Sequence, residues 1–219
     1  MAAPTQLTLY NGALRLCRQP KLSATTDTID ARYQLDNVWG SGGADTIDYC
    51  LEQGQWIFAR RTAELSFDPS FTAPFGLQYA FNKPSDWVRT AMVCSDPYFT
   101  VPLTQYSDEV STIYADITPI YFMYISNDPS YGANFTEWPQ TFVRFVEAYL
   151  AREIVNYVTG SDEVIKDVMA KYQVRLTDAR SKMAMNEATA FTPIGSWVRA
   201  RRGRSGYIQD GGSASNLIG

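Results

Sequence analysis

Residues 139–183, PQTFVRFVEAYLAREIVNYVTGSDEVIKDVMAKYQVRLTDARSKM, predict two helices in succession. Pro139 suits the first turn of the first helix, in which large apolar residues then recur at helical spacing. Gly160 and Ser161 separate the two helices, because glycine favours a helix C-terminus and serine an N-cap. In the second helix, apolar residues return every three or four positions from Val164 to Met183. This end of the chain is therefore expected to be helical.

The first 60 residues predict three more helices. Thr5 is expected to cap the first and Asp27 the second, since both residue types favour the N-cap. A glycine-rich run, residues 40–43, breaks the chain before a third helix from Asp45 to Arg60. This third helix is apolar over much of its surface, which indicates a central place in a bundle.

The middle of the chain, residues 62–126, changes character. Short β-prone runs alternate with proline-containing turns about every 10 residues, which is typical of an antiparallel sheet or a small barrel. Proline places several of these runs at edges or in loops. The run from Trp87 to Val93 is compatible with a strand or with a helical turn. The runs are Ala63 to Phe67, Leu77 to Phe81, Trp87 to Val93, Thr100 to Tyr106, Thr112 to Ala115 and Ile120 to Ile125.

We therefore predict an α+β fold. Residues 1–61 and 137–188 form a helical bundle domain, because neither set of helices alone is large enough for a secure core. Residues 62–136 form an inserted antiparallel β domain. Residues 189–219 form an extended basic C-terminal arm.

Composition excludes most enzymatic chemistry. The chain has 219 residues and no histidine, so Ser-His-Asp or Cys-His nucleophile activation and His-ligated metals are absent. Cys17, Cys50 and Cys94 form no C-x-x-C pair and are expected in the core. We expect no enzyme activity, cofactor or metal. No apolar run has the roughly 18 residues of a membrane span, and no signal peptide is evident.

Paired carboxylates are the remaining candidates for catalysis. The pairs Asp27–Asp30 and Asp45–Asp48 lie near predicted helix N-termini, where acidic residues complement the helix dipole. Asp108 and Glu109 lie in a predicted turn, where acidic residues are common. A structural role is expected for all three pairs.

The C-terminal arm carries a net charge of about +3 on a chain whose total is −4. Docking on an acidic protein surface, a disordered tail and nucleic-acid binding all remain open for this arm. The contact residues that we predict are Trp197, Arg199, Arg201, Arg202, Arg204 and Tyr207. The β-rich middle also has more aromatic residues than a small sheet needs, which indicates that some lie in subunit contacts.

Five segments, taken in order, resemble one family. They are LYNGALRL (9–16), CLEQGQWIFA (50–59), NKPSDWVR (82–89), WPQTF (138–142) leading to VTGS (158–161), and GSWVRAR (195–201). In this order the series is similar to the tail tubular protein A family, the head-to-tail adaptors of short-tailed bacteriophages.

The resemblance implies a structural virion protein, assembled in the host cytoplasm and located in the tail at the portal vertex. Members form a ring, typically of twelve copies, that joins the portal to the tail nozzle, lines the DNA exit channel and can hold tail fibres. DNA would pass during ejection without sequence-specific binding. The arm would then dock on the portal, and Tyr98, Phe99, Tyr106 and Tyr131 would contact the nozzle or a neighbouring subunit. Alternatives are another head-completion or tail-terminator ring protein, and a nucleic-acid-binding accessory protein.

Overall fold

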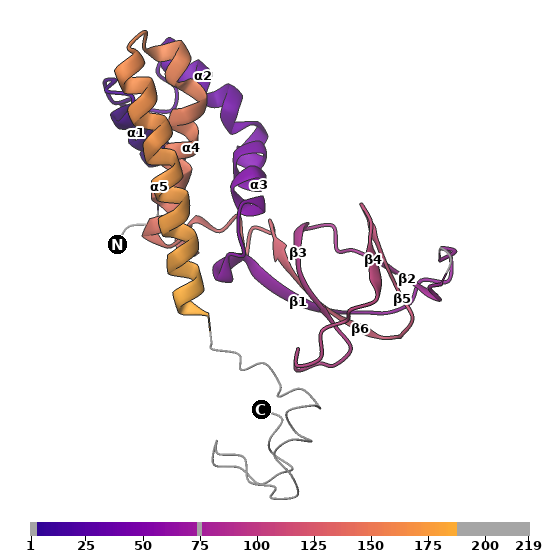
Figure 1. Ribbon diagram of the computed structural model, residues 1–219. Helices are drawn as coiled ribbons and strands as arrows, with labels where there is room; N and C mark the ends of the chain where they lie inside the picture. The colour runs from indigo at the N-terminus through magenta and orange to yellow at the C-terminus, as the bar shows by residue number, and fades with distance from the viewer. Residues whose placement is uncertain (1–3, 74–75, 188–219) are drawn as a thin grey trace, which may run out of the picture. The chain divides into compact units, whose positions relative to one another are not determined.

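Helices occupy both ends of the described chain, and strands occupy its middle (Figure 1). The computed structural model describes residues 4–73 and 76–187. The α+β class is confirmed as a mixture of helices and two small antiparallel sheets. The separate β domain and the extended arm stay predictions. The arm, with Trp197, Arg199, Arg201, Arg202, Arg204 and Tyr207, lies outside the described residues.

The helix α4 is the centre of the bundle. The helices are α1 (Gln6–Leu16), α2 (Asp30–Trp39), α3 (Ala44–Glu52), α4 (Gln140–Val158) and α5 (Asp162–Asn186). The other four helices all contact α4, and buried residues occur around most of its circumference, as expected for a central helix. The N-terminal and C-terminal helices therefore share one core, as predicted. The prediction that the third helix is central was wrong.

Capping explains where the first two helices begin. Thr5 caps α1 as predicted: its hydroxyl accepts the Thr8 N–H at 3.3 Å, and the Thr8 hydroxyl accepts the Thr5 N–H at 2.7 Å. The predicted cap of α2 was wrong, because Ile29 occupies that position. The Asp27 carboxylate instead accepts the backbone N–H groups of Ser23 and Ala24, so it closes the preceding turn.

The helix α3 is shorter than predicted, because a tryptophan terminates it. Trp56 folds back, and its indole N–H donates to the carbonyls of Cys50 and Leu51 at 3.0 and 3.1 Å. Gly54 permits this turn, since a Cβ there would press on the Trp56 ring. A short 3-10 turn, Ile57–Ala59, then leads directly into the first strand.

Six strands form two three-stranded antiparallel sheets. They are β1 (Arg60–Leu65), β2 (Tyr79–Asn82), β3 (Trp87–Cys94), β4 (Tyr106–Asp108), β5 (Thr112–Ala115) and β6 (Ile120–Ser126), with orders β1-β6-β3 and β2-β5-β4. The Asp68 N–H donates to the Ala80 carbonyl on one side, and Cys94 bridges to Pro102 on the other. The sheets are thus linked along both sides, in the manner of a small barrel.

Two sequence predictions for the strands are resolved. Trp87–Cys94 is a strand, which settles the open choice at that segment. The run predicted from Thr100 to Tyr106 is mostly a loop. The Asp96 carboxylate accepts the N–H groups of Thr100 and Val101 at 2.8–3.2 Å, which withdraws them from strand pairing.

The strand β6 contributes to two cores. Ile120, Phe122 and Tyr124 point into the core between the sheets, whereas Ile125 packs into the core of the helical bundle. This follows from the two-residue period of a strand, which turns alternate side chains to opposite faces. We call residues 60–126 the β region and the five helices the helical bundle.

Candidate interaction surface

Three connections of the β region meet at one end. All strand pairs are antiparallel, so the connections β1–β2, β3–β4 and β5–β6 lie at the same end. The opposite end holds the β4–β5 hairpin, and there the chain passes to the helical bundle before Arg60 and after Ser126. The fold therefore gathers three loops far apart in sequence.

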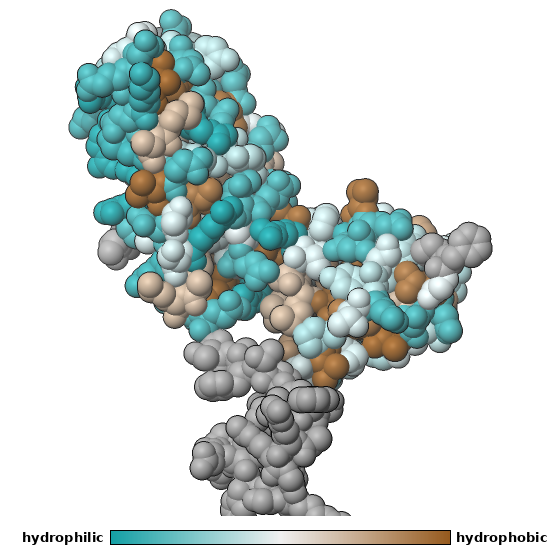
Figure 2. Space-filling model, viewed as in Figure 1, coloured by the Kyte–Doolittle hydropathy of each residue, from teal (hydrophilic) through white to brown (hydrophobic). Residues whose placement is uncertain are grey.

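These three loops expose large apolar side chains. Tyr98 is 84% exposed and Val101 54% exposed, values that are unusual for side chains of this type. We call this set the loop end: Phe67, Phe71, Tyr98, Val101, Tyr106 and Ile117. Figure 2 shows hydrophobic residues, in brown, on the visible face of the β region. A cluster of loops with exposed large apolar side chains at one end of a fold is typical of a protein-binding surface.

The loop that carries Tyr98 is held in shape by one carboxylate. Asp96 accepts the Thr100 hydroxyl at 2.8 Å in addition to the two backbone N–H groups described above. Burial opposes ionisation of Asp96, but these hydrogen bonds outweigh it and lower its pKa. Phe99 has a φ of 57°, in the left-handed region that non-glycine residues rarely adopt. The loop is thus ordered, although its apolar side chains face solvent.

The structure brings together three of the four predicted contact residues. Tyr98 and Phe99 lie in the β3–β4 loop, and Tyr106 begins β4 at the same end. Tyr131 follows β6 and lies at the opposite end, where the Arg61 guanidinium sits 5.0 Å from its ring centre. Tyr131 therefore does not belong to the loop end.

Sequence reasoning missed Phe67, Val101 and Ile117. Each stands immediately before or within two positions of a proline in a turn: Asp68-Pro69, Val101-Pro102 and Thr118-Pro119. An apolar residue beside a turn proline has little opportunity to enter a sheet. This pattern was available in the sequence and would have identified them.

The NKPSDWVR segment stabilises the opposite end of the β region. The Lys83 ammonium group binds Asp108 at 2.5 Å and lies 3.7 Å from the centre of the Trp87 ring. Asp86 accepts hydrogen bonds from Arg61 at 3.0 Å and from the Ser126 hydroxyl. Burial opposes ionisation of Asp86, but the bonds from Ser126 and Arg61 prevail, and its pKa is lowered. These charges therefore tie strands together.

A polar groove of about 530 Å³ lies over α1 and α4. Its lining residues are Thr8, Asn11, Gly12, Arg15, Gln19, Lys21 and Glu147. Glu147 is buried and pairs with Arg15 at 3.5 Å and Arg175 at 3.4 Å, while burial raises its pKa. Asn11 and Gln19 are engaged by backbone groups of Leu22 and Val158. These polar groups already have protein partners, so the groove offers no obvious ligand chemistry.

The carboxylate pairs considered for catalysis have structural partners. Asp48 accepts the Asn127 amide at 2.9 Å, and Asp108 pairs with Lys83. The three cysteines are free and buried, and burial raises the pKa of each thiol. Among residues 4–73 and 76–187, no cluster of three or more Cys, Asp or Glu is placed to hold a metal ion.

In the part of the chain that the structure describes, no helix combines the length and apolarity needed to cross a membrane. The chain matches no protein-family model, and no curated protein sequence matches it.

Proposed function

We propose that this chain is a structural protein of a short-tailed phage virion. It forms a ring that joins the portal to the tail nozzle and surrounds the DNA exit channel. The observation that carries the proposal is the ordered series of five segments from Leu9 to Arg201, which resembles the head-to-tail adaptors.

The surface of the β region supports a role in assembly. The loop end concentrates apolar residues on an ordered scaffold, as protein-binding surfaces do. Aromatic residues such as Tyr98 contribute disproportionately to binding energy when a partner buries them. We assign the loop end to the nozzle contact and the basic arm to the portal contact.

The charge of the chain suits a conduit for DNA. The net charge of the whole chain is −4. The arm carries about +3, so the remainder of the chain carries about −7. An acidic wall does not hold passing phosphates, whereas a basic wall would. A basic arm on an acidic body is therefore expected to dock outside the channel.

The experiment is imaging of the purified protein after mixing with DNA-filled capsids that lack tails. A ring on the single portal vertex supports the proposal, and particles that ignore that vertex overturn it. A variant lacking residues 190–219 is the matched test of the arm. It should keep the helical circular dichroism of the full chain but no longer bind the capsids.

The alternatives predict different outcomes of the same preparation. A head-completion or tail-terminator ring would bind a different partner or show a different ring size. A nucleic-acid-binding accessory protein would bind free DNA with an affinity that falls steeply with salt.

A further inference from the structure

The polar groove over α1 and α4 has a basic rim. Residues 4–26, which include α1, contain three cations and no aspartate or glutamate. Two of these cations, Arg15 and Lys21, line the groove. The Arg15 side chain is 71% exposed. Lys21 is also exposed, and it forms no ion pair within residues 4–73 and 76–187.

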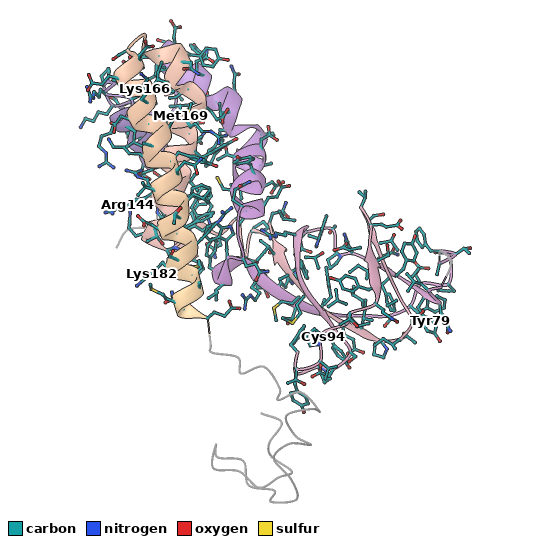
Figure 3. All side chains as sticks on the ribbon, viewed as in Figure 1. Tyr79, Cys94, Arg144, Lys166, Met169 and Lys182 are labelled. Carbon is teal, nitrogen blue, oxygen red and sulfur yellow. The ribbon has the colours of Figure 1, made fainter. Side chains whose placement is uncertain are left out.

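Two further arginines extend this positive charge across α4 to α5. The Arg175 guanidinium donates to the Arg144 carbonyl at 2.9 Å, and it shares one carboxylate oxygen of Glu147 with Arg15. Arg144, labelled in Figure 3, is exposed and has no ion-pair partner in the described part of the chain. Burial lowers the pKa of the Arg175 guanidinium, and Glu147 opposes that effect. Repulsion from Arg15 and Arg144 adds to the lowering, so positive charge is in excess here.

We call Arg15, Lys21, Arg144 and Arg175 the cationic cluster. It carries four positive charges, and Glu147 is the one carboxylate in the groove lining, which leaves a net charge of +3. The carboxylates on the adjoining side of α5 do not change this balance, because each has its own cation. The pairs are Arg18–Glu163 at 3.4 Å, Asp167–Lys171 at 2.7 Å, and Asp178–Lys182, which are one helical turn apart.

We propose that the groove and its cationic cluster bind an acidic segment of a partner protein. Guanidinium groups match carboxylates in geometry as well as charge, and clusters of arginine recognise acidic motifs. The amides of Asn11 and Gln19 are engaged within the protein, so charge and not neutral hydrogen bonding selects the ligand. This inference goes beyond the ring proposed above and does not depend on it.

The size of the groove favours a peptide over double-stranded DNA. Its volume of about 530 Å³ lies within the range of about 300–1,000 Å³ that is typical of ligand sites. The side chains of an extended peptide fit a groove of this volume. A DNA duplex instead presents its phosphates on a broad convex surface, which does not enter it.

Fluorescence anisotropy of a labelled hexaglutamate peptide tests the proposal, with the full-length protein as titrant at physiological ionic strength. The cluster variant carries Lys21→Gln and Arg144→Gln. It should bind the peptide at least about tenfold more weakly, because two of the four positive charges are lost. Both side chains are exposed and lack ion pairs, so circular dichroism and thermal unfolding should match those of the parent chain. A hexaglutamine peptide should not bind.

The basic C-terminal arm supplies the matched control, since it also attracts acidic peptides. The arm variant, Arg199→Gln with Arg201→Gln, removes the same charge and should weaken binding by no more than about twofold. A loss in the arm variant equal to that in the cluster variant would overturn the proposal. Equal binding of the two peptides by the parent chain, or binding of neither, would also overturn it.

A labelled DNA duplex in the same assay tests the other class of polyanion. If the duplex binds more tightly than the peptide, and the cluster variant loses that binding, nucleic acid is the occupant and the peptide assignment is wrong. The outcome is separable from that of the proposed function, because the assay uses the isolated protein and the ring assay uses capsids. Peptide binding without capsid binding would overturn the adaptor function alone.

Discussion

The helical bundle and the β region treat their apolar side chains differently. In the bundle, Trp39, Trp56 and Trp138 are all at most 6% exposed and pack against further aromatic rings. The core of the β region consists of Phe81, Val93, Ile113, Ala115, Ile120, Phe122 and Tyr124. Nearly as many large apolar residues remain exposed at its loop end. The bundle also exposes several large apolar residues, but its buried core is several times larger than that of the β region. The β region therefore keeps a larger share of its apolar residues available for contact.

This difference predicts where substitutions should act. A residue of the bundle core should change the free energy of unfolding. An exposed residue of the loop end should change binding and leave that free energy nearly constant. Substitutions in both regions test this division. A large loss of stability from a loop-end substitution, or a core substitution that leaves the free energy of unfolding unchanged, would contradict it.

Trp56→Ala should have the largest effect on stability. It removes a fully buried ring that packs on Phe142 and Phe145, and it also removes the two hydrogen bonds that end α3. The free energy of unfolding should fall by about 3–5 kcal/mol, measured by urea denaturation. A loss below about 1 kcal/mol would mean that the bundle core is not packed as described.

Gly12→Ala tests the close approach of α1 and α4. A Cβ at this position would overlap the Glu147 carboxyl group, which Arg15 and Arg175 hold in place. The substitution should therefore cost about 1–3 kcal/mol of unfolding free energy.

The matched control for this prediction is the same substitution in a Glu147→Ala chain. There the obstruction is gone, and the higher helix propensity of alanine should stabilise α1 by up to about 1 kcal/mol. Equal costs in both backgrounds would show that the overlap with Glu147 is not the cause.

Asp86→Asn should remove an acid-sensitive part of the stability of the β region. The folded-state pKa of Asp86 is lowered, so its contribution is present above the ordinary carboxyl pKa and is lost as pH falls through the folded value. At pH 7 the variant should lose about 1–2 kcal/mol of unfolding free energy, because charge-assisted bonds to Arg61 and Ser126 are weakened. Unfolding curves from pH 2 to 7 should then show a smaller loss at low pH than the parent chain.

Glu147 should show the opposite dependence on pH. Burial raises its pKa, so the folded state binds the proton more tightly, and stability falls as pH rises from the ordinary carboxyl value through the folded one. Glu147→Gln should flatten the stability profile in that window, measured by the same unfolding curves. An unchanged slope would contradict the assignment of Glu147 as a buried carboxylate with a raised pKa.

Local patterns predicted the helices better than the site. Thr5, with its hydroxyl cap, and the apolar spacing after Pro139 fixed α1 and α4, because caps and helical periodicity act within a few residues. The end of α3 depends on Trp56 reaching back to the carbonyls of Cys50 and Leu51, which the apolar spacing of this segment did not indicate. The loop end depends on which loops the antiparallel pairing brings together. Tyr98 was suspected from the sequence and the turn prolines could have identified Ile117, but the separation of Tyr131 depends on the strand pairing and could not be predicted.

Tyr98→Ala should have the smallest effect on folding and a large one on binding. The side chain is 84% exposed, so the free energy of unfolding should change by less than about 0.5 kcal/mol. If the loop end is a contact surface, the same chain should bind its tail partner at least about tenfold more weakly, as truncation of a buried aromatic anchor does. Val110→Ala is the matched control, since Val110 is 89% exposed but lies in the hairpin at the opposite end of the β region. Equal losses of binding for both variants would mean that exposure alone, and not the gathering of three loops, determines the contact.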